Sequence, residues 1–344
     1  MDFLYSKGIF RSLLCIVLSI TLLLPLTSCG KAIDESTVYG VYFDTYVSIT
    51  AYDGTDTSVL NDALTKCAEY ELIFSPTLEG SELYKLNHRD GSQNLSDTPG
   101  EYRAILSDDL YALIKEALDI NALTNGAFSP ALGSIKALWD FDSDEPVIPD
   151  DKTVSAALAH TDINNIILED SDQSITLLDD ELGIDLGGIA KGYIADCLAD
   201  YLKDKGVTQA VIRLGGNIYC IGDKYGQDYS VMISKPFGQA NESVATLKVS
   251  DTSVVTAGVY EQYFEKDGRL YHHITDPSTG YPADSDLTGV TIICPDSSLS
   301  DALSTSVLVL GSEEGAKLLD SFDNISAVLV DNDGNVTYLG PLFD

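Results

Sequence analysis

The hydrophobic pattern of the chain predicts a mixture of helices and hairpins without a regular strand–helix alternation. Polar and apolar residues alternate over 41–52, as in a strand with one buried face. Apolar residues recur at helical spacing over 62–74 and 108–121. Further helices are expected over 153–159, 189–203, 299–310 and 313–322. Further strands are expected over 165–168, 174–178, 210–213, 229–234, 244–249, 262–264, 271–274, 288–293, 325–330 and 336–339.

This order of elements is typical of the α+β class, with an antiparallel sheet and flanking helices. No repeat, low-complexity segment or clear linker divides the chain. We therefore expect one compact catalytic unit over 41–344, in one lobe or two.

The N-terminus predicts export and a lipid anchor rather than a part of the fold. Lys7 and Arg11 precede an apolar run over 13–26, which is shorter than the ~20 residues of a spanning helix. Leu-Thr-Ser-Cys at 26–29 resembles the bacterial lipobox, in which the cysteine is acylated, for example with palmitate. We expect a signal peptide over 1–28, a lipidated Cys29 with a tether over 29–40, and attachment outside the cytoplasm through the lipid only. A plain secretory signal is the alternative.

The charge of the chain excludes one class of partner. Asp and Glu number 54 against 20 Lys and Arg, a formal net charge of −34, which argues against binding nucleic acid. An acidic surface for solubility is the ordinary explanation. An acidic site that binds phosphates would, however, need a divalent cation. The mature cysteines, Cys67, Cys197, Cys220 and Cys294, show no C-x-x-C spacing and so do not suggest zinc; their disulfide status stays open.

The segment D-L-G-G-I-A-K-G-Y at 185–193 is the strongest local signal. Two glycines are expected to end a strand and lead into a helix, where backbone N–H groups and Lys191 would face an anion. Asp185 would accept hydrogen bonds from a ligand. The spacing fits neither G-x-G-x-x-G nor a P-loop, and a structural glycine turn is an equal alternative.

Asp301 and Thr305 lie four residues apart at the expected start of a helix, and so on one side of it. A carboxylate and a hydroxyl are hard oxygen ligands suited to Mg²⁺. The competing interpretation is that Ser300 or Asp301 only caps the helix.

Two of the four histidines, His272 and His273, precede the turn signals Asp-Pro and Thr-Gly at 276–277 and 279–280. Strand alternation would place them on opposite faces. One of them is a candidate base, although a lone histidine is more often part of the structure.

Together these motifs resemble the ApbE family of FAD:protein FMN transferases. The resemblance runs from about 43 to 311 and rests on the segment at 185–193, L-G-G-N at 214–217, Y-E-x-Y-F at 260–264, H-H-I-T-D-P-x-T-G-Y-P at 272–282 and D-A-L-S-T at 301–305. It implies Mg²⁺-dependent transfer of FMN from FAD to a threonine or serine of exported clients, with AMP released. Such clients would carry an Asp-Gly-x-Thr-Ser/Thr acceptor.

The resemblance also implies roles for particular residues. Asp301, Thr305 and a backbone oxygen near Gly188 would hold Mg²⁺, and His273, aided by Asp301, would deprotonate the incoming hydroxyl. The flavin contacts that it implies are Phe43, Thr77, Ala127, Phe128, Ser129, Asp185, Lys191 and Ile274. Thr77 stands where relatives often have an aromatic residue, and Ala257 where they often have serine. Two other functions remain open: an FAD pyrophosphatase that makes FMN and AMP, and a non-catalytic flavin-binding lipoprotein.

Overall fold

The computed structural model describes residues 35–343 except 91–93, 142, 144 and 240. The expected signal peptide, Cys29 and the first half of the expected tether therefore lie outside the described residues. Asp34–Asp344 forms one compact unit with its own hydrophobic cores, as expected of a segment that folds by itself. No helix in the described part of the chain is both long and apolar enough to cross a membrane.

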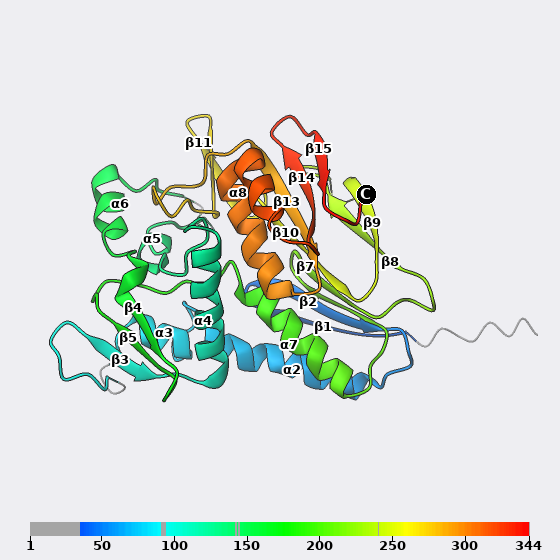
Figure 1. The fold of residues 1–344 in the computed structure, drawn as a ribbon, viewed down its shortest axis with the longest axis horizontal. Helices are drawn as coiled ribbons and strands as arrows, with labels where there is room; N and C mark the ends of the chain where they lie inside the picture. The colour runs from blue at the N-terminus through cyan, green and yellow to red at the C-terminus, as the bar shows by residue number, and fades with distance from the viewer. Residues whose placement is uncertain (1–34, 91–93, 142, 144, 240, 344) are drawn as a thin grey trace, which may run out of the picture. The chain divides into compact units, whose positions relative to one another are not determined.

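The main element of the unit is an eight-stranded sheet, whose described strands all pair antiparallel with their neighbours (Figure 1). In spatial order its strands are β1 (Ser36–Tyr42), β2 (Thr45–Ala51), β6 (Ala210–Leu214), β7 (Asn217–Ile221), β10 (Thr252–Gly258), β13 (Leu287–Cys294), β14 (Ser326–Asp331) and β15 (Val336–Leu339). Three smaller sheets are built from β3 (Tyr102–Ile105), β5 (Ser174–Leu177) and β4 (Ile166–Glu169); β8 (Tyr229–Ser234) and β9 (Ser243–Val249); and β11 (Tyr263–Lys266) and β12 (Arg269–His272).

Helices cover one face of the main sheet. The helices are α2 (Thr57–Phe74), α3 (Glu82–Asn87), α4 (Asp108–Leu123), α5 (Gly133–Lys136), α6 (Asp151–Leu158), α7 (Ala190–Asp204) and α8 (Ser297–Leu319). Of these, α2, α7 and α8 pack on the sheet, and α7 also packs on α8. The predicted α+β class with an antiparallel sheet is confirmed.

Strand alternation gives the two faces of the sheet different cores. In β6, Ile212 and Leu214 belong to the core under the helices, whereas Val211 belongs to a second core under the β8–β9 hairpin. The sheet is therefore buried on both faces, by helices on one and by a hairpin on the other.

Two expected elements differ from the structure. The strand predicted over 41–52 is a hairpin, β1–β2, in which Phe43 and Asp44 form the turn with φ of 54° each. Such a turn usually carries Asn-Gly, so Phe-Asp gave no signal. The sheet also begins at Ser36, within the expected tether. The two helices predicted over 299–310 and 313–322 are confirmed as the two segments of α8, which are separated at Gly311 by non-helical backbone with φ of 80° and ψ of 176°.

The four described cysteines are free thiols, of which Cys67, Cys220 and Cys294 are buried. Burial raises the pKa of Cys67 and of Cys220 to about 12. The apolar sequence neighbours of Cys197 and Cys220 predict small buried residues, which holds for Cys220, whereas Cys197 is only partly buried.

The helices α7 and α8 meet without room for a side chain at Gly192. A Cβ on this residue would stand 2.2 Å from the carbonyl oxygen of Ser297. We expect Gly192→Ala to lower the free energy of unfolding by at least about 1–3 kcal/mol, because backbone has to move. Urea unfolding followed by circular dichroism measures this.

The matched control is Gly289→Ala in β13, where a Cβ would meet its nearest neighbours at 3.6 Å, an ordinary contact. Equal free energies of unfolding for the two variants would contradict the close contact between α7 and α8 at Gly192.

Candidate active site

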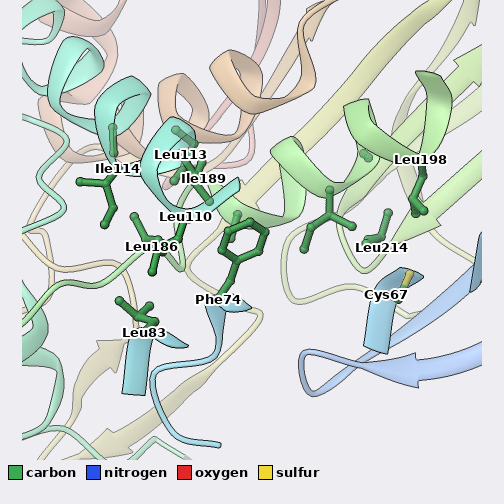
Figure 2. Close-up of a cluster of buried hydrophobic side chains, with 14 of the residues drawn as sticks. Cys67, Phe74, Leu83, Leu110, Leu113, Ile114, Leu186, Ile189, Leu198 and Leu214 are labelled. Atoms are coloured by element: carbon green, nitrogen blue, oxygen red, sulfur yellow. The ribbon is translucent and has the colours of Figure 1, made fainter. Parts of the chain in front are cut away.

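The glycine loop before α7 is anchored by the apolar residues on either side of it. Leu186 and Ile189 are buried against Leu110 and Leu113 of α4 (Figure 2). Gly187, between them, is exposed, and Gly188 is partly exposed. Two buried side chains therefore hold a short stretch of backbone at the surface, where a ligand can approach it.

The expectation that these glycines end a strand is wrong. The residues before them have no strand partner; instead the Asp185 N–H donates to the carbonyl of Pro130 at 2.8 Å, and the Ile184 N–H donates to Oδ1 of Asn87 at 2.8 Å. The loop is thus fixed by individual hydrogen bonds rather than by a ladder.

The first turn of α7, the positive end of the helix dipole, lies beside Asp301. The helix begins at Ala190, and no side chain caps it. Lys191 folds back and donates to the Gly187 carbonyl at 3.1 Å, while the Gly192 N–H donates to Oδ2 of Asp301 at 2.9 Å. The loop, Lys191 and Asp301 therefore form one connected group.

Asp301 is not a helix cap. The cap of α8 is Asp296, whose Oδ1 accepts the Leu299 N–H at 2.9 Å. Asp301 lies inside the helix and is 5% exposed. Thr305 follows one turn later, and its Oγ1 would lie 3.4 Å from a Cβ placed on Gly188. The structure thus places Gly188, Asp301 and Thr305 near one another.

These groups fit a hard cation by their chemistry. A carboxylate, a hydroxyl and a backbone carbonyl are oxygen donors of the kind that Mg²⁺ takes. No cluster of three His, Cys, Asp or Glu side chains able to hold a metal occurs among the described residues. A cation would therefore depend on the hydroxyl and backbone oxygens, with Asp301 as its charged ligand.

A buried amide at the start of β7 also points to a polar ligand. Asn217 is 1% exposed, and neither its Nδ2 nor its Oδ1 has a hydrogen-bond partner. Buried amides are nearly always paired. The preceding residue, Gly216, lies beside Glu261, whose Oε1 would be 3.2 Å from an added Cβ. Burial raises the pKa of Glu261 to about 6, the Lys191 charge opposes this shift, and the Asp301 charge adds to it.

The two histidines have different surroundings. His272 is buried, and its Nε2 is 3.0 Å from the Ala283 carbonyl. His273 is partly exposed, and its Nδ1–H donates to the Gln262 carbonyl at 3.3 Å, which leaves Nε2 with the lone pair. Burial, together with the positive charges of Lys136 and Lys191, lowers the pKa of His273 to about 3. His273 is therefore a neutral imidazole at physiological pH.

Lys136 is a site residue that no sequence motif revealed. Its ammonium, at the end of the short helix α5, donates to the His273 carbonyl at 2.5 Å. Burial lowers its pKa, the Asp185 charge raises it, and the Lys191 charge lowers it. Two ammonium groups thus flank His273 and Asp185 in a chain that is otherwise strongly acidic. Helix α5 is only one turn long, too short to give a periodic pattern in the sequence, so Lys136 could not be placed from the sequence.

Only some of the residues expected to contact the flavin lie beside the glycine loop. Ala127 and Phe128 are buried in the turn after α4, beside the partly exposed Ser129, and the Phe128 ring would lie 3.3 Å from a Cβ on Gly188. Ile274 is buried in the core beneath α8, so only its backbone is available.

Two of the expected flavin residues lie elsewhere along α2. The Phe43 N–H donates to Glu71 at 2.7 Å, and Thr77 is exposed just beyond the helix. Phe74 packs edge-on against Tyr193 of α7, with ring centroids 5.7 Å apart, and so joins this end of α2 to the site helix. Within the described residues, no hydrogen bond joins Phe43 or Thr77 to Asp301, Thr305 or Lys191.

A family model matches residues 43–329 and is described as the ApbE family. The chain belongs to the ApbE family. The glycine loop and the Asp301 helix both lie within the matched range.

Relatives and solved structures agree with this assignment. A FAD:protein FMN transferase of Treponema pallidum is 34% identical over 293 residues, which cover 81% of this chain and 78% of the relative. One of Klebsiella pneumoniae is also 34% identical, covering 79% of this chain and 82% of the relative. The flavin transferase ApbE of Vibrio cholerae has a TM-score of 0.77 at 26% identity, covering 90% and 98% of the two chains. The ApbE protein of Thermotoga maritima has a TM-score of 0.78 at 28% identity.

Removing the Lys136 charge should raise the pKa of His273. A nearby positive charge disfavours the imidazolium, so we expect Lys136→Met to shift this pKa upward by about one unit, with burial keeping it below its usual range. An NMR titration of the His273 imidazole measures the shift.

Lys136→Arg, which keeps the charge, and Lys152→Met, on the exposed surface of α6, are the controls. An unchanged pKa in Lys136→Met would show that the two groups do not interact.

Proposed function

We propose that this protein transfers FMN from FAD to a threonine or serine hydroxyl of client proteins and releases AMP. The observation that carries this proposal is the placement of Asp301 inside α8, on the Gly192 N–H and beside Gly188 and Thr305. The curated relatives named FAD:protein FMN transferase support it.

Mg²⁺ would be held by Asp301, Thr305 and the Gly188 backbone, where it would neutralise the charge of the FAD pyrophosphate. The protein's own groups would add to this neutralisation. Lys191, Lys136 and the positive end of the α7 dipole supply positive potential at the same place.

The histidine fits the role of base. A client hydroxyl oxygen would form a bond to the FMN phosphorus, the bond from that phosphorus to the bridging oxygen would break, and the bridging oxygen would leave on AMP with its electron pair. The hydroxyl proton would pass to Nε2 of His273, which is neutral and holds its lone pair. The carboxylate of Asp301 would help to hold the reacting hydroxyl.

A second candidate is hydrolysis of FAD to FMN and AMP with water as the nucleophile. The partial exposure of His273 favours it, because water can reach the same base. A flavin-binding protein without chemistry would need Asp301 as a mere cap, and Asp296 holds that position.

Asp301→Asn should reduce flavin transfer at least about 100-fold, because the variant keeps an oxygen for the Gly192 N–H but loses the charged ligand. The assay mixes the protein, FAD, Mg²⁺ and a peptide with an Asp-Gly-x-Thr-Ser segment. It follows flavin on the peptide by mass spectrometry and AMP by chromatography.

The control is Asp320→Asn at the exposed end of α8, which removes the same charge and should change neither product. AMP release that is equal with and without the peptide, with no labelled peptide, would favour the pyrophosphatase. Absence of both products with the unsubstituted protein would favour a flavin-binding protein.

We also propose that the protein is anchored by a lipid on Cys29 and acts outside the cytoplasm. Labelled palmitate should enter the full chain and be lost in Cys29→Ser. Cys15→Ser, within the apolar run of the expected signal, should keep the label. Equal labelling of the two variants, or no label in the unsubstituted chain, would contradict the anchor.

A further inference from the structure

A cavity of about 270 Å³ opens on the hairpin-covered side of the main sheet. Arg213 of β6, Lys224 of the β7–β8 loop and Lys248 of β9 line it, together with Tyr52, Asp228 and Ser230. The cavity is separate from the candidate active site, because the side chain of Arg213 follows Val211 onto the sheet face opposite the helices.

The three cations of this cavity have no carboxylate partner. None of them forms a salt bridge within the described part of the chain. The Lys224 ammonium lies 3.8 Å from the centre of the Tyr52 ring, and the Lys248 ammonium donates to Ser230 at 2.5 Å. In a chain with 54 acidic and 20 basic side chains, three unpaired cations around one cavity favour an anionic ligand.

Two acidic side chains limit the charge of that ligand. Asp228 lines the cavity and accepts the Ser250 hydroxyl. Glu35 lies close enough to Tyr52 for its negative charge to raise the pKa of the Tyr52 hydroxyl, whereas the charge of Arg213 lowers it. The net charge favours a small anion, such as one phosphate diester, over a polyanion. The volume is also below the ~300–1,000 Å³ of sites for larger organic ligands.

The cavity lies where the chain enters the folded unit. Ser36 pairs with Ala51, the residue before Tyr52, so the segment that follows Cys29 arrives at the edge of the cavity. Ser36 follows Cys29 by seven positions, a stretch of chain that spans at most about 25 Å when fully extended. A lipid on Cys29 would therefore keep this side of the unit near the membrane surface.

We propose that this cavity binds the phosphate of an anionic phospholipid headgroup and holds the β8–β9 side of the protein against the membrane (Figure 1). The proposal rests on the proposed lipid anchor for its location and is independent of flavin transfer. The tether supplies the proximity that a weak, single-headgroup contact needs.

The test uses the folded unit 34–344, which has no lipid of its own. Its binding to phosphatidylcholine vesicles with and without phosphatidylglycerol is measured by flotation. We expect binding only with phosphatidylglycerol, about a fivefold loss in Arg213→Gln, and a small change in Lys152→Gln, which removes the same charge far from the cavity. Because Arg213 is exposed, its replacement should leave the fold intact. Thermal unfolding of both variants verifies this.

Inorganic phosphate and glycerol phosphate, added without vesicles, distinguish a soluble anion from a lipid. Shifts of Lys224 and Lys248 NMR signals with these anions, in the absence of vesicle binding, would overturn the lipid proposal. Equal losses in the two variants would also overturn it. The anchor is tested separately at Cys29, so failure of the cavity proposal leaves that result unaffected.

Discussion

Gly192 brings two helices so close that the backbone of α7 touches the backbone of α8, and Asp301 bonds to α7 across this contact. A side chain at Gly192 would separate the helices, and Asp301 would lose its N–H donor. Since Thr305 and the glycine loop are positioned by the same two helices, one steric constraint determines whether the oxygen ligands can converge. The packing of the core and the chemistry of the site thus depend on the same residue.

The candidate active site gathers positive charge, whereas the chain as a whole is strongly negative. Lys136, Lys191 and the start of α7 gather positive potential in a protein of net charge −34. Burial and these two ammonium groups keep His273 neutral, so an acidic protein can hold both an unprotonated base and a phosphate-bearing substrate. Glu261 nevertheless has a raised pKa, because its burial and the charge of Asp301 outweigh the charge of Lys191.

The sequence was sufficient for elements with strong periodicity and for motifs whose members are close in the chain. The α+β class, helix α4 and the spacing of Asp301 and Thr305 follow from local pattern. Lys136 did not, because its role comes from a contact with His273, 137 residues away, and from a helix of one turn. The strand at 217–221 was likewise not predicted, because two glycines precede it. Which aspartate caps α8, Asp296 or Asp301, depends on where the helix begins, and only the structure shows this.

The cysteines have a consequence for how the fold is stabilised. The described chain is held together without a cystine, and its buried thiols carry so little thiolate at neutral pH that exchange with outside disulfides is slow. The described fold therefore does not rely on a disulfide bond for its stability.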